Sequence, residues 1–360
     1  MKGFGYGIAA GVMATFAGLT SVFVGLALFV PERLPAPALS RIVNIDEKLR
    51  FLRENRHFDP HILAVGSSIT WRQLAGAAFD PERSGRFLNG GLVHVKIHQT
   101  REVADFYLAH YRNIRDLLML VSLPDFEDCT GDSPEMFDPE DAARYVFEGW
   151  PAAYFYARYF APQRYARTAL TLPSQRVPLR GDLYFDAYGS GPVQEPSDVD
   201  LGLRYKAIDT DPACTKDLID LSREVSAQGI RLTIVFAPIH PDYHKQYPAA
   251  SAAIAQVAED VRRATEGDNT GVMVMHDDKR FGRRDFWDAF HMQWTSAQTL
   301  SEIIVRGMQA AKVASSTGAA PHESRAPKGH VASATAPAAV GRFESIRPTP
   351  QMTTNRDDPL

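Results

Sequence analysis

Short apolar runs that alternate with helical patterns constrain this chain more than any other feature. The runs cover residues 61–66, 86–89, 117–122, 231–237 and 271–275. Helical patterns cover residues 69–78, 97–111, 218–228 and 249–265, and a last one begins at Thr295. Strands that alternate with helices are typical of a parallel sheet with helices on both faces. The sequence therefore predicts an α/β fold with a doubly wound, mostly parallel five-stranded sheet, and a ligand site beyond the carboxyl ends of its strands.

The two ends of the chain differ in composition from its middle. Residues 4–30 contain no charged residue, and about 20 apolar residues suffice to cross a bilayer core. We therefore expect an uncleaved transmembrane anchor within residues 1–32; the alternative is a cleaved signal peptide, whose apolar core is about 7–15 residues long. Residues 313–360 are rich in Ala, Ser, Thr, Pro and Gly, which predicts a disordered tail. The α/β domain is then expected over residues 50–312.

Charge and cysteine content exclude several classes of protein. The chain has 39 Lys and Arg against 43 Asp and Glu, a net charge of −4, so it lacks the basic footprint of a nucleic-acid-binding protein. Two cysteines are too few for a disulfide scaffold, and they lack zinc-site spacing. His94 and His98 have the spacing of a metal pair, but no glutamate accompanies them in a zinc-protease pattern. We expect neither a metal nor a cofactor.

A long stretch between the third strand and the helix at residue 218 interrupts the alternation. It predicts a helical insertion over about residues 129–215, with an aromatic-rich helix at 145–165. The aromatic side chains there suit core packing or the wall of a sugar groove. Cys129 and Cys214 stand near the two ends of the insertion. Their spacing is compatible with a disulfide, if the domain lies outside the cytosol, and equally with two buried thiols.

Three polar motifs follow predicted strands. Ser68, preceded by another serine, comes directly after the first strand, where the amides of a helix N-terminus favour negative charge; helix capping is the alternative. Gly91 ends an Asn-Gly-Gly turn after the second strand, where glycine lets backbone amides approach a ligand. Asp288 and His291 are three residues apart before the last helix, where the carboxylate can orient the imidazole.

The order of these motifs resembles that of the SGNH (GDSL-like) hydrolase and acyltransferase superfamily, over about residues 60–312. The resemblance implies a flavodoxin-like sheet and a catalytic triad of Ser68 as nucleophile, His291 as base and Asp288 as its partner. It also implies an oxyanion hole formed by the backbone amides of Ser68 and Gly91. The family's third motif carries an asparagine donor, whereas Asp125 stands at the corresponding strand end here. Loss of one such donor typically costs ~10²–10³ in turnover.

A membrane-anchored branch of the superfamily, which acylates cell-surface or exported polysaccharides, resembles this chain most. The double serine, the aromatic insertion and the strand end at residues 236–240 support this likeness. It implies an anchor through residues 4–30 in a bacterial inner membrane, a periplasmic domain, and a membrane-bound acyl-donor protein as partner. The expected function is a serine O-acyltransferase or esterase acting on polysaccharide, with Asn89, Asp125 and His240 as candidate substrate contacts. The alternative is an inactive relative that binds glycan or serves as a scaffold.

Overall fold

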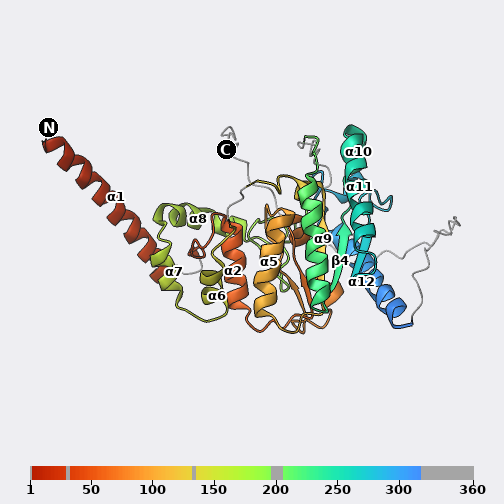
Figure 1. Cartoon of the computed structure of the whole chain (residues 1–360). Coiled ribbons are helices and arrows are strands. Elements are labelled where there is room, and N and C mark those ends of the chain that lie inside the picture. Colours follow the sequence, from red (N-terminus) through yellow and green to blue (C-terminus); the bar gives the residue numbers. More distant parts are fainter. Residues whose placement is uncertain (1, 30–32, 132–134, 196–205, 318–360) are drawn as a thin grey trace, which may run out of the picture. The chain divides into compact units, whose positions relative to one another are not determined.

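A five-stranded parallel sheet forms the centre of the protein. The computed structural model describes residues 2–29, 33–131, 135–195 and 206–317. The strands run in the order β2-β1-β3-β4-β5 (Figure 1). Their bounds are β1 (Ile62–Ala64), β2 (Phe87–Asn89), β3 (Asp116–Val121), β4 (Arg231–Phe236) and β5 (Thr270–Val274). All neighbouring pairs are parallel, which confirms the predicted α/β fold and its sheet.

The order of the strands reverses at β1, which pairs with β2 on one side and β3 on the other. In such a sheet the connections leave the strands in opposite directions on either side of this point, and a crevice opens at the carboxyl ends of the strands. The side chains of β3 are almost completely buried, as expected for a central strand covered on both faces. The switch point between β1 and β3 is therefore the place where the fold favours a ligand site.

Helices cover the sheet and build the insertion. Their bounds are α1 (Lys2–Phe29), α2 (Val43–Glu54), α3 (Ser68–Gln73), α4 (Gly76–Phe79), α5 (Ile97–His110), α6 (Pro139–Val146), α7 (Ala152–Arg158), α8 (Pro162–Gln175), α9 (Pro212–Ala227), α10 (Pro241–Gln246), α11 (Pro248–Ala264) and α12 (Trp294–Thr317). Two short 3-10 turns, η2 (Leu123–Phe126) and η3 (Arg283–Asp285), complete the elements used below. The fold begins earlier than the expected residue 50, because α2 buries Ile45, Leu49 and Leu52.

Two predicted helices are divided in the structure. The pattern at residues 69–78 forms α3 and α4, and side chains satisfy the backbone at the break: Ser301 Oγ accepts from the Ala75 amide, and Ser190 Oγ donates to the Leu74 carbonyl. The aromatic pattern at 145–165 forms parts of α6, α7 and α8. Gly149 has a φ of +82° there, and Pro151 precedes α7, so one continuous helix was the wrong prediction.

The two ends of the chain are described only in part. No helix among the residues whose side chains are described is long and apolar enough to cross a membrane, so the anchor remains a prediction. At the other end, α12 continues to Thr317, beyond the expected boundary at residue 312. The predicted disordered tail, from residue 318 onward, lies outside the described residues.

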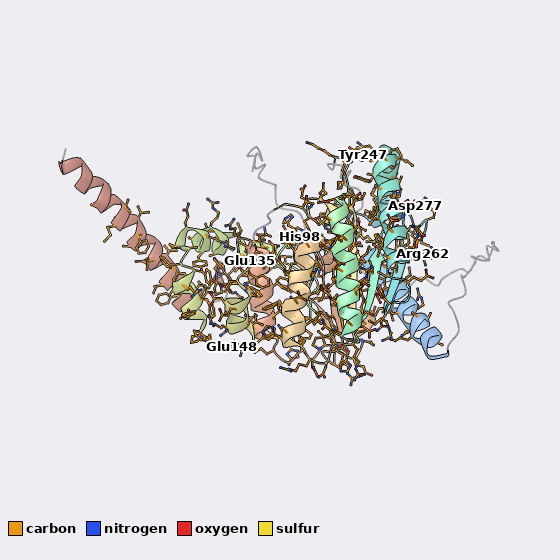
Figure 2. All side chains as sticks on the ribbon, viewed as in Figure 1. His98, Glu135, Glu148, Tyr247, Arg262 and Asp277 are labelled. Carbon is orange, nitrogen blue, oxygen red and sulfur yellow. A yellow bond between two sulfur atoms is a disulfide. The ribbon has the colours of Figure 1, made fainter. Side chains whose placement is uncertain are left out.

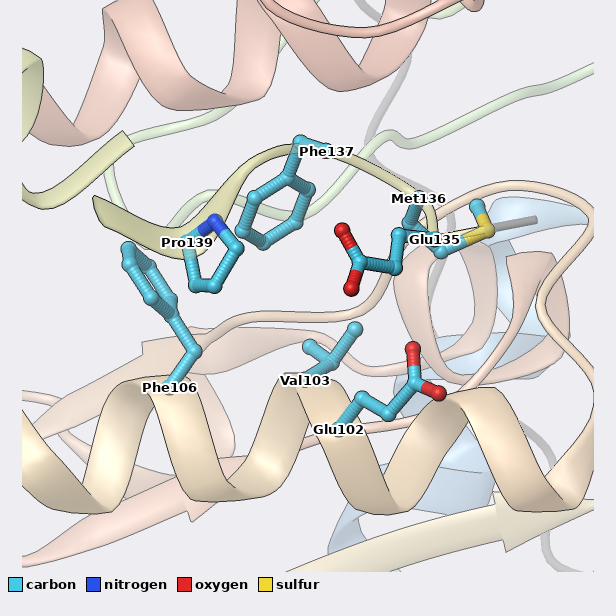
Figure 3. A pocket seen from close by; sticks show the side chains of 7 residues that line it. All are labelled: Glu102, Val103, Phe106, Glu135, Met136, Phe137 and Pro139. Atoms are coloured by element: carbon cyan, nitrogen blue, oxygen red, sulfur yellow. The ribbon is translucent and has the colours of Figure 1, made fainter. Parts of the chain in front are cut away.

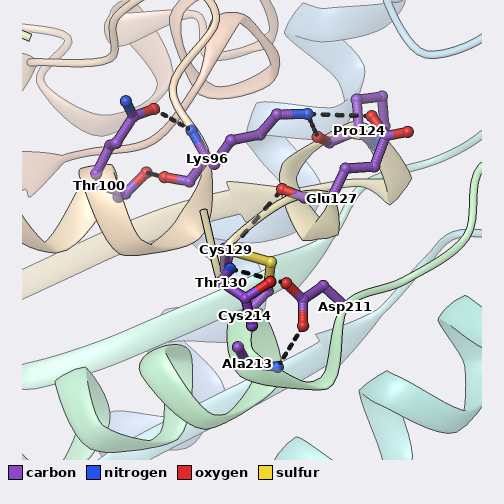
Figure 4. Close-up of a disulfide and its surroundings, with 10 residues drawn as sticks. Lys96, Thr100, Pro124, Glu127, Cys129, Thr130, Asp211, Ala213 and Cys214 are labelled. Atoms are coloured by element: carbon purple, nitrogen blue, oxygen red, sulfur yellow. Dashed lines mark hydrogen bonds and ion pairs between the residues drawn. A yellow bond between two sulfur atoms is a disulfide. The ribbon is translucent and has the colours of Figure 1, made fainter. Parts of the chain in front are cut away.

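A disulfide closes the base of the insertion (Figure 4). The structure joins Cys129 to Cys214. Beside it, the Asp211 amide donates to the Phe126 carbonyl at 2.7 Å, and Asp211 Oδ2 accepts from the Thr130 amide at 2.9 Å. These contacts hold the two ends of the insertion together next to the carboxyl end of β3.

Candidate active site

A tight turn between β1 and α3 presents Ser68. Gly66 has a φ of +144°, and a Cβ there would lie 2.3 Å from Thr70 Oγ1, so only glycine fits. The Thr70 hydroxyl donates to the Leu120 carbonyl at 3.0 Å, and thus ties the turn to β3. Ser67 caps α3 through its own hydroxyl oxygen. Ser68 is consequently fixed at the first position of α3, partly exposed to solvent, at the switch point of the sheet.

Ser68, His291 and Asp288 lie in one chain of hydrogen bonds. His291 Nε2 is 2.9 Å from Ser68 Oγ, and His291 Nδ1 is 2.7 Å from Asp288 Oδ2. The other carboxylate oxygen of Asp288 accepts the amides of Phe290 and His291 at 2.8 and 2.7 Å. Burial by itself would raise the pKa of Asp288, but the His291 ring and the two amides lower it below its ordinary value. The structure thus brings the three predicted residues together, with an ionised carboxylate behind the imidazole.

Side chains that the sequence did not single out hold the His291 loop in place. Gln73 Nε2 donates to the Phe290 carbonyl at 2.7 Å, across 217 residues of sequence. The indole of Trp287 stacks on the His291 ring, with 4.9 Å between ring centroids. Gln73 is completely buried, and a buried amide needs a partner. The position of Gln73 on the helix that begins at Ser68 could have marked it as a residue near the site. The sequence could not show that its partner is the Phe290 carbonyl.

The Asn89 side chain and the Gly91 amide, both expected at the site, already have partners within the protein. The Gly91 amide, expected to face an oxyanion, donates to Asn89 Oδ1 at 3.0 Å. Asn89 is fully buried, and its Nδ2 donates to the carbonyls of Thr70 and Trp71 and to Ser190 Oγ, at 3.0 to 3.2 Å. The Gly91 amide is therefore engaged within the turn after β2, and the Asn89 side chain joins that turn to α3. Asn89 thus has a structural role in this turn, and its contact with substrate stays a prediction.

Asp125 lies beside the nucleophile turn, in η2 after β3. Its Oδ2 accepts the Ser122 amide at 2.8 Å, and its carboxyl group also hydrogen-bonds the Ser67 side chain. Burial raises the pKa of Asp125 to about 6, against the opposing effect of these bonds. The Ser68 amide, at the first position of α3, makes no hydrogen bond within the described residues. An oxyanion beside Ser68 can thus draw on this amide.

His240 contacts the loop that carries Asp288 and His291, and two of its polar groups already have partners. Its backbone amide donates to the Ala289 carbonyl at 3.0 Å, and its Nδ1 accepts the Asp242 amide at 3.0 Å to cap α10. Burial lowers the pKa of His240, which keeps the ring neutral. A contact between His240 and substrate stays a prediction.

The insertion returns to the site after its helices. The Tyr188 carbonyl accepts the Asn89 amide at 2.9 Å, beside the edge strand β2. Further on, the Gly191 amide donates to the Trp71 carbonyl at 3.0 Å, and the Val193 carbonyl accepts the Trp294 amide at 2.9 Å. Residues 188–193 therefore run along α3 to the start of α12, so the insertion contributes directly to the surroundings of the triad.

His94 and His98, considered above as a metal pair, do not lie on one helix. His94 is exposed in a turn with a φ of +57°, whereas His98 lies on α5 (Figure 2). No group of three or more His, Cys, Asp or Glu side chains in the described ranges is arranged to hold a metal ion.

A separate cavity of about 220 Å³ lies between α5 and residues 135–139 (Figure 3). It is lined by Phe106, Phe137 and the carboxylates of Glu102 and Glu135, among others. Burial, with Glu135 as a nearby like charge, raises the pKa of Glu102. The triad residues are not part of its lining.

Solved structures, but no family model and no curated sequence, are similar to this chain. No family model matches the sequence, and no curated protein matches it either. Among solved structures, the chain is similar to a proposed platelet activating factor from Streptococcus pneumonia, with 12% identity and a TM-score of 0.42, over 73% of this chain and 91% of that one. It is also similar to a carbohydrate acetylesterase family member from Sinorhizobium meliloti, with 10% identity and a TM-score of 0.32, over 69% of this chain and 98% of that one. At these values the likeness assigns neither a family nor an activity to this chain.

Proposed function

We propose that this protein is an SGNH-type serine hydrolase or acyltransferase that acts on acyl esters. The observation that carries the proposal is the continuous hydrogen-bonded chain from Asp288 through His291 to Ser68. His291 Nε2 takes the hydroxyl proton as Ser68 Oγ attacks the ester carbonyl, and Asp288 keeps the proton on Nδ1 and stabilises the imidazolium. The imidazolium then protonates the leaving alcohol. Water or a sugar hydroxyl, activated by the same imidazole, releases the acyl group from Ser68.

The substrate and the location are further parts of the proposal. O-acyl groups on cell-surface or exported polysaccharide are the proposed substrates, and transfer to sugar would draw on a membrane-bound acyl-donor protein. The uncharged residues 4–30 support a bacterial inner-membrane anchor. The Cys129–Cys214 disulfide supports a periplasmic domain, because disulfides persist in oxidising compartments.

Labelling of the full-length protein with a fluorophosphonate tests for an activated serine. Wild type should become labelled, and Ser68→Ala and His291→Ala should not. Ser251→Ala is the matched control: Ser251 Oγ is 2.7 Å from His244 Nδ1, but the other nitrogen of that ring is 2.7 Å from the His276 carbonyl and not beside a carboxylate. This variant should be labelled like wild type. Labelling that survives in Ser68→Ala would place the reactive nucleophile elsewhere and refute the proposed site.

A catalytically inactive, glycan-binding or scaffold protein is the second candidate. The observation that favours it is the engaged Gly91 amide, together with Asp125 in place of an amide side chain. Folded wild type that resists labelling would support this candidate. Labelled wild type should instead release acetate from an acetyl ester, and added oligosaccharide acceptors would show by mass spectrometry whether the acyl group passes to sugar.

A further inference from the structure

The loop that carries His291 is closed as a short antiparallel hairpin. Phe286 and Met292 pair across it as an antiparallel bridge, and the Trp287 amide donates to the His291 carbonyl at 3.0 Å. Trp287 and His291 are therefore directly opposite each other, and side chains at opposite positions of an antiparallel pair lie on the same face. The backbone of this loop thus fixes the indole beside the imidazole.

The two rings lie face to face. Their planes are inclined by 22°, and their centroids are 4.9 Å apart. The negative face of an aromatic ring attracts a cation, and indole attracts it most strongly. In the proposed mechanism the imidazole becomes cationic when it takes the Ser68 proton, and the His291 side chain is only 12% exposed. Water therefore solvates this cation poorly, and a cation–π contact contributes most when the cation is desolvated.

The indole N–H shows that packing alone does not explain a tryptophan here. Trp287 Nε1 is buried and has no hydrogen-bond partner within the part of the chain that the structure describes. A buried donor without a partner destabilises a fold. Phenylalanine at this position would fill much of the same space without that penalty. The advantage of tryptophan over phenylalanine is its ring face, which binds a cation more strongly.

Charged and titratable groups on the neighbouring elements also act on this pair of rings. Asp288 bonds to Nδ1 of the imidazole, and Asp125 of η2 interacts electrostatically with the same ring. Arg72 of α3 and His240 at the start of α10 interact with Asp288. All four groups stay in place in the variants described below, so a difference from wild type reports on the indole.

We infer that Trp287 is a positioning residue that stabilises the protonated His291 ring during acyl transfer. This inference rests on the proposed function and adds a residue to the same site. The indole keeps the imidazole in the plane in which its Nε2 is 2.9 Å from Ser68 Oγ. Its face attracts the imidazolium more than the neutral ring. The contact therefore strengthens as the proton moves, which is the condition for it to accelerate the reaction.

The pH profile of acetyl-ester hydrolysis tests the role in turnover, with the full-length chain. In Trp287→Leu we expect kcat to fall about 2- to 30-fold, with KM little changed. The midpoint of the acidic limb of kcat/KM should move to lower pH by about 0.4–1.5 pH units, because a less stabilised imidazolium loses its proton sooner. Trp287→Phe keeps a weaker ring face and should lie between wild type and Trp287→Leu. Trp150→Leu is the matched control, because Trp150 contacts Tyr154 and Arg144, and it should match wild type.

Tryptophan fluorescence tests the contact between the rings without any substrate. A protonated imidazole quenches a stacked indole, whereas a neutral imidazole quenches it little. The emission of wild type should therefore fall as the pH drops from about 8 to about 5, the range in which histidine titrates. This loss of emission should be absent from His291→Gln and from Trp287→Phe, and Trp150→Phe should retain it.

The possible outcomes separate the inference from the proposed function. A lower kcat in Trp287→Leu with an unchanged acidic limb would show a purely steric role and overturn the inference. Emission without any His291-dependent loss would also overturn it. If Trp287→Leu does not fold, Trp287→Phe must show a smaller shift of the acidic limb in the same direction. Wild type that shows the loss of emission, but neither reacts with fluorophosphonate nor hydrolyses an ester, would overturn the proposed function and with it the role of Trp287 in turnover, while the ring contact would stand.

Discussion

By the resemblance described above, Asp125 takes the place of an asparagine that donates a hydrogen bond to an oxyanion. Burial raises its pKa to about 6, so its carboxyl group loses the donor proton as the pH rises through that value. Asp125→Asn keeps a donor at every pH. One oxyanion donor is worth ~10²–10³ in turnover, and we expect the variant to hydrolyse an acetyl ester at least about tenfold faster than wild type at pH 8.

The pH profile of kcat/KM for wild type and Asp125→Asn measures this effect. The advantage of the variant should shrink toward pH 5, where the wild-type carboxyl is protonated. Glu127→Gln removes a nearby carboxylate that pairs with Lys96, and its profile should follow wild type. An Asp125→Asn enzyme that is slower than wild type at every pH would instead mean that the ionised carboxylate is the useful form.

Gln73 positions the histidine loop without reaching the reacting atoms. Gln73→Met removes the buried hydrogen bond to the Phe290 carbonyl and lets His291 drift from Ser68. Because misplacement by about 1 Å can cost up to 10²-fold, we expect kcat to fall about tenfold or more, with KM little changed. Separate measurement of kcat and KM checks this. Gln99→Met, which removes another buried amide at the start of α5, should leave kcat unchanged; a similar loss there would point to general destabilisation.

At the scale of elements, the disulfide is the main covalent constraint on the insertion. Cys129 and Cys214 are 85 residues apart in sequence, and a cross-link over such a loop stabilises by ~4 kcal/mol in a chain-entropy model. The double variant Cys129→Ser with Cys214→Ser should therefore lose about that much free energy of unfolding, measured in urea. Wild type in reductant should approach the variant. Equal stability of wild type and variant without reductant would show that the loop is already ordered in the unfolded chain.

The sheet was predictable because each strand has a recognisable local sequence pattern. A buried parallel strand is a short apolar run, and Gly, Ser or Pro marks its end. The helix α2 gave no such signal, since its core-facing side includes Asp46, Glu47 and Lys48. Their partners, Arg164 for Asp46 and Arg176 for Glu47, lie more than 100 residues away. Sequence patterns cannot show that a charged helix is buried when the compensating charges are so distant.

The candidate site likewise has a part that the sequence predicts and a part that it does not. Ser68, Asp288 and His291 were found because each motif is local and the order of the motifs is informative. The contact among these three residues depends on the parallel arrangement of the strands, which the alternation of strands and helices predicts. The full set of contacts of the Asn89 side chain could not be predicted, because it includes Ser190, a residue of the insertion that comes 101 positions later.

For the whole molecule, Lys48 joins three parts that the sequence keeps apart. It is fully buried on α2, and its Nζ donates to the Asn89 carbonyl at 2.8 Å and the Gly189 carbonyl at 2.6 Å. One side chain thus links α2, the end of β2 and the returning part of the insertion. Burial lowers the pKa of Lys48 to about 7, although Asp186 opposes the change. A neutral amine has two N–H groups, which match the two carbonyls without a buried charge.

A neutral Lys48 in the folded protein makes the contribution of this residue to the stability of the fold increase with pH. Lysine in the unfolded chain titrates near 10.4, so between pH 7 and 10 the unfolded state binds a proton that folded Lys48 does not. The contribution of Lys48 to the free energy of unfolding then rises with pH over this range. Lys48→Met leaves two buried carbonyls unpaired, at about 1–3 kcal/mol each, and removes the titration. The difference in free energy of unfolding between wild type and Lys48→Met, measured in urea, should therefore widen from pH 7 to pH 9. Lys216→Met, at an exposed position of α9, is the control and should show no such trend. A difference that is constant across this range would mean that Lys48 stays charged in the fold, with Asp186 as its counter-ion.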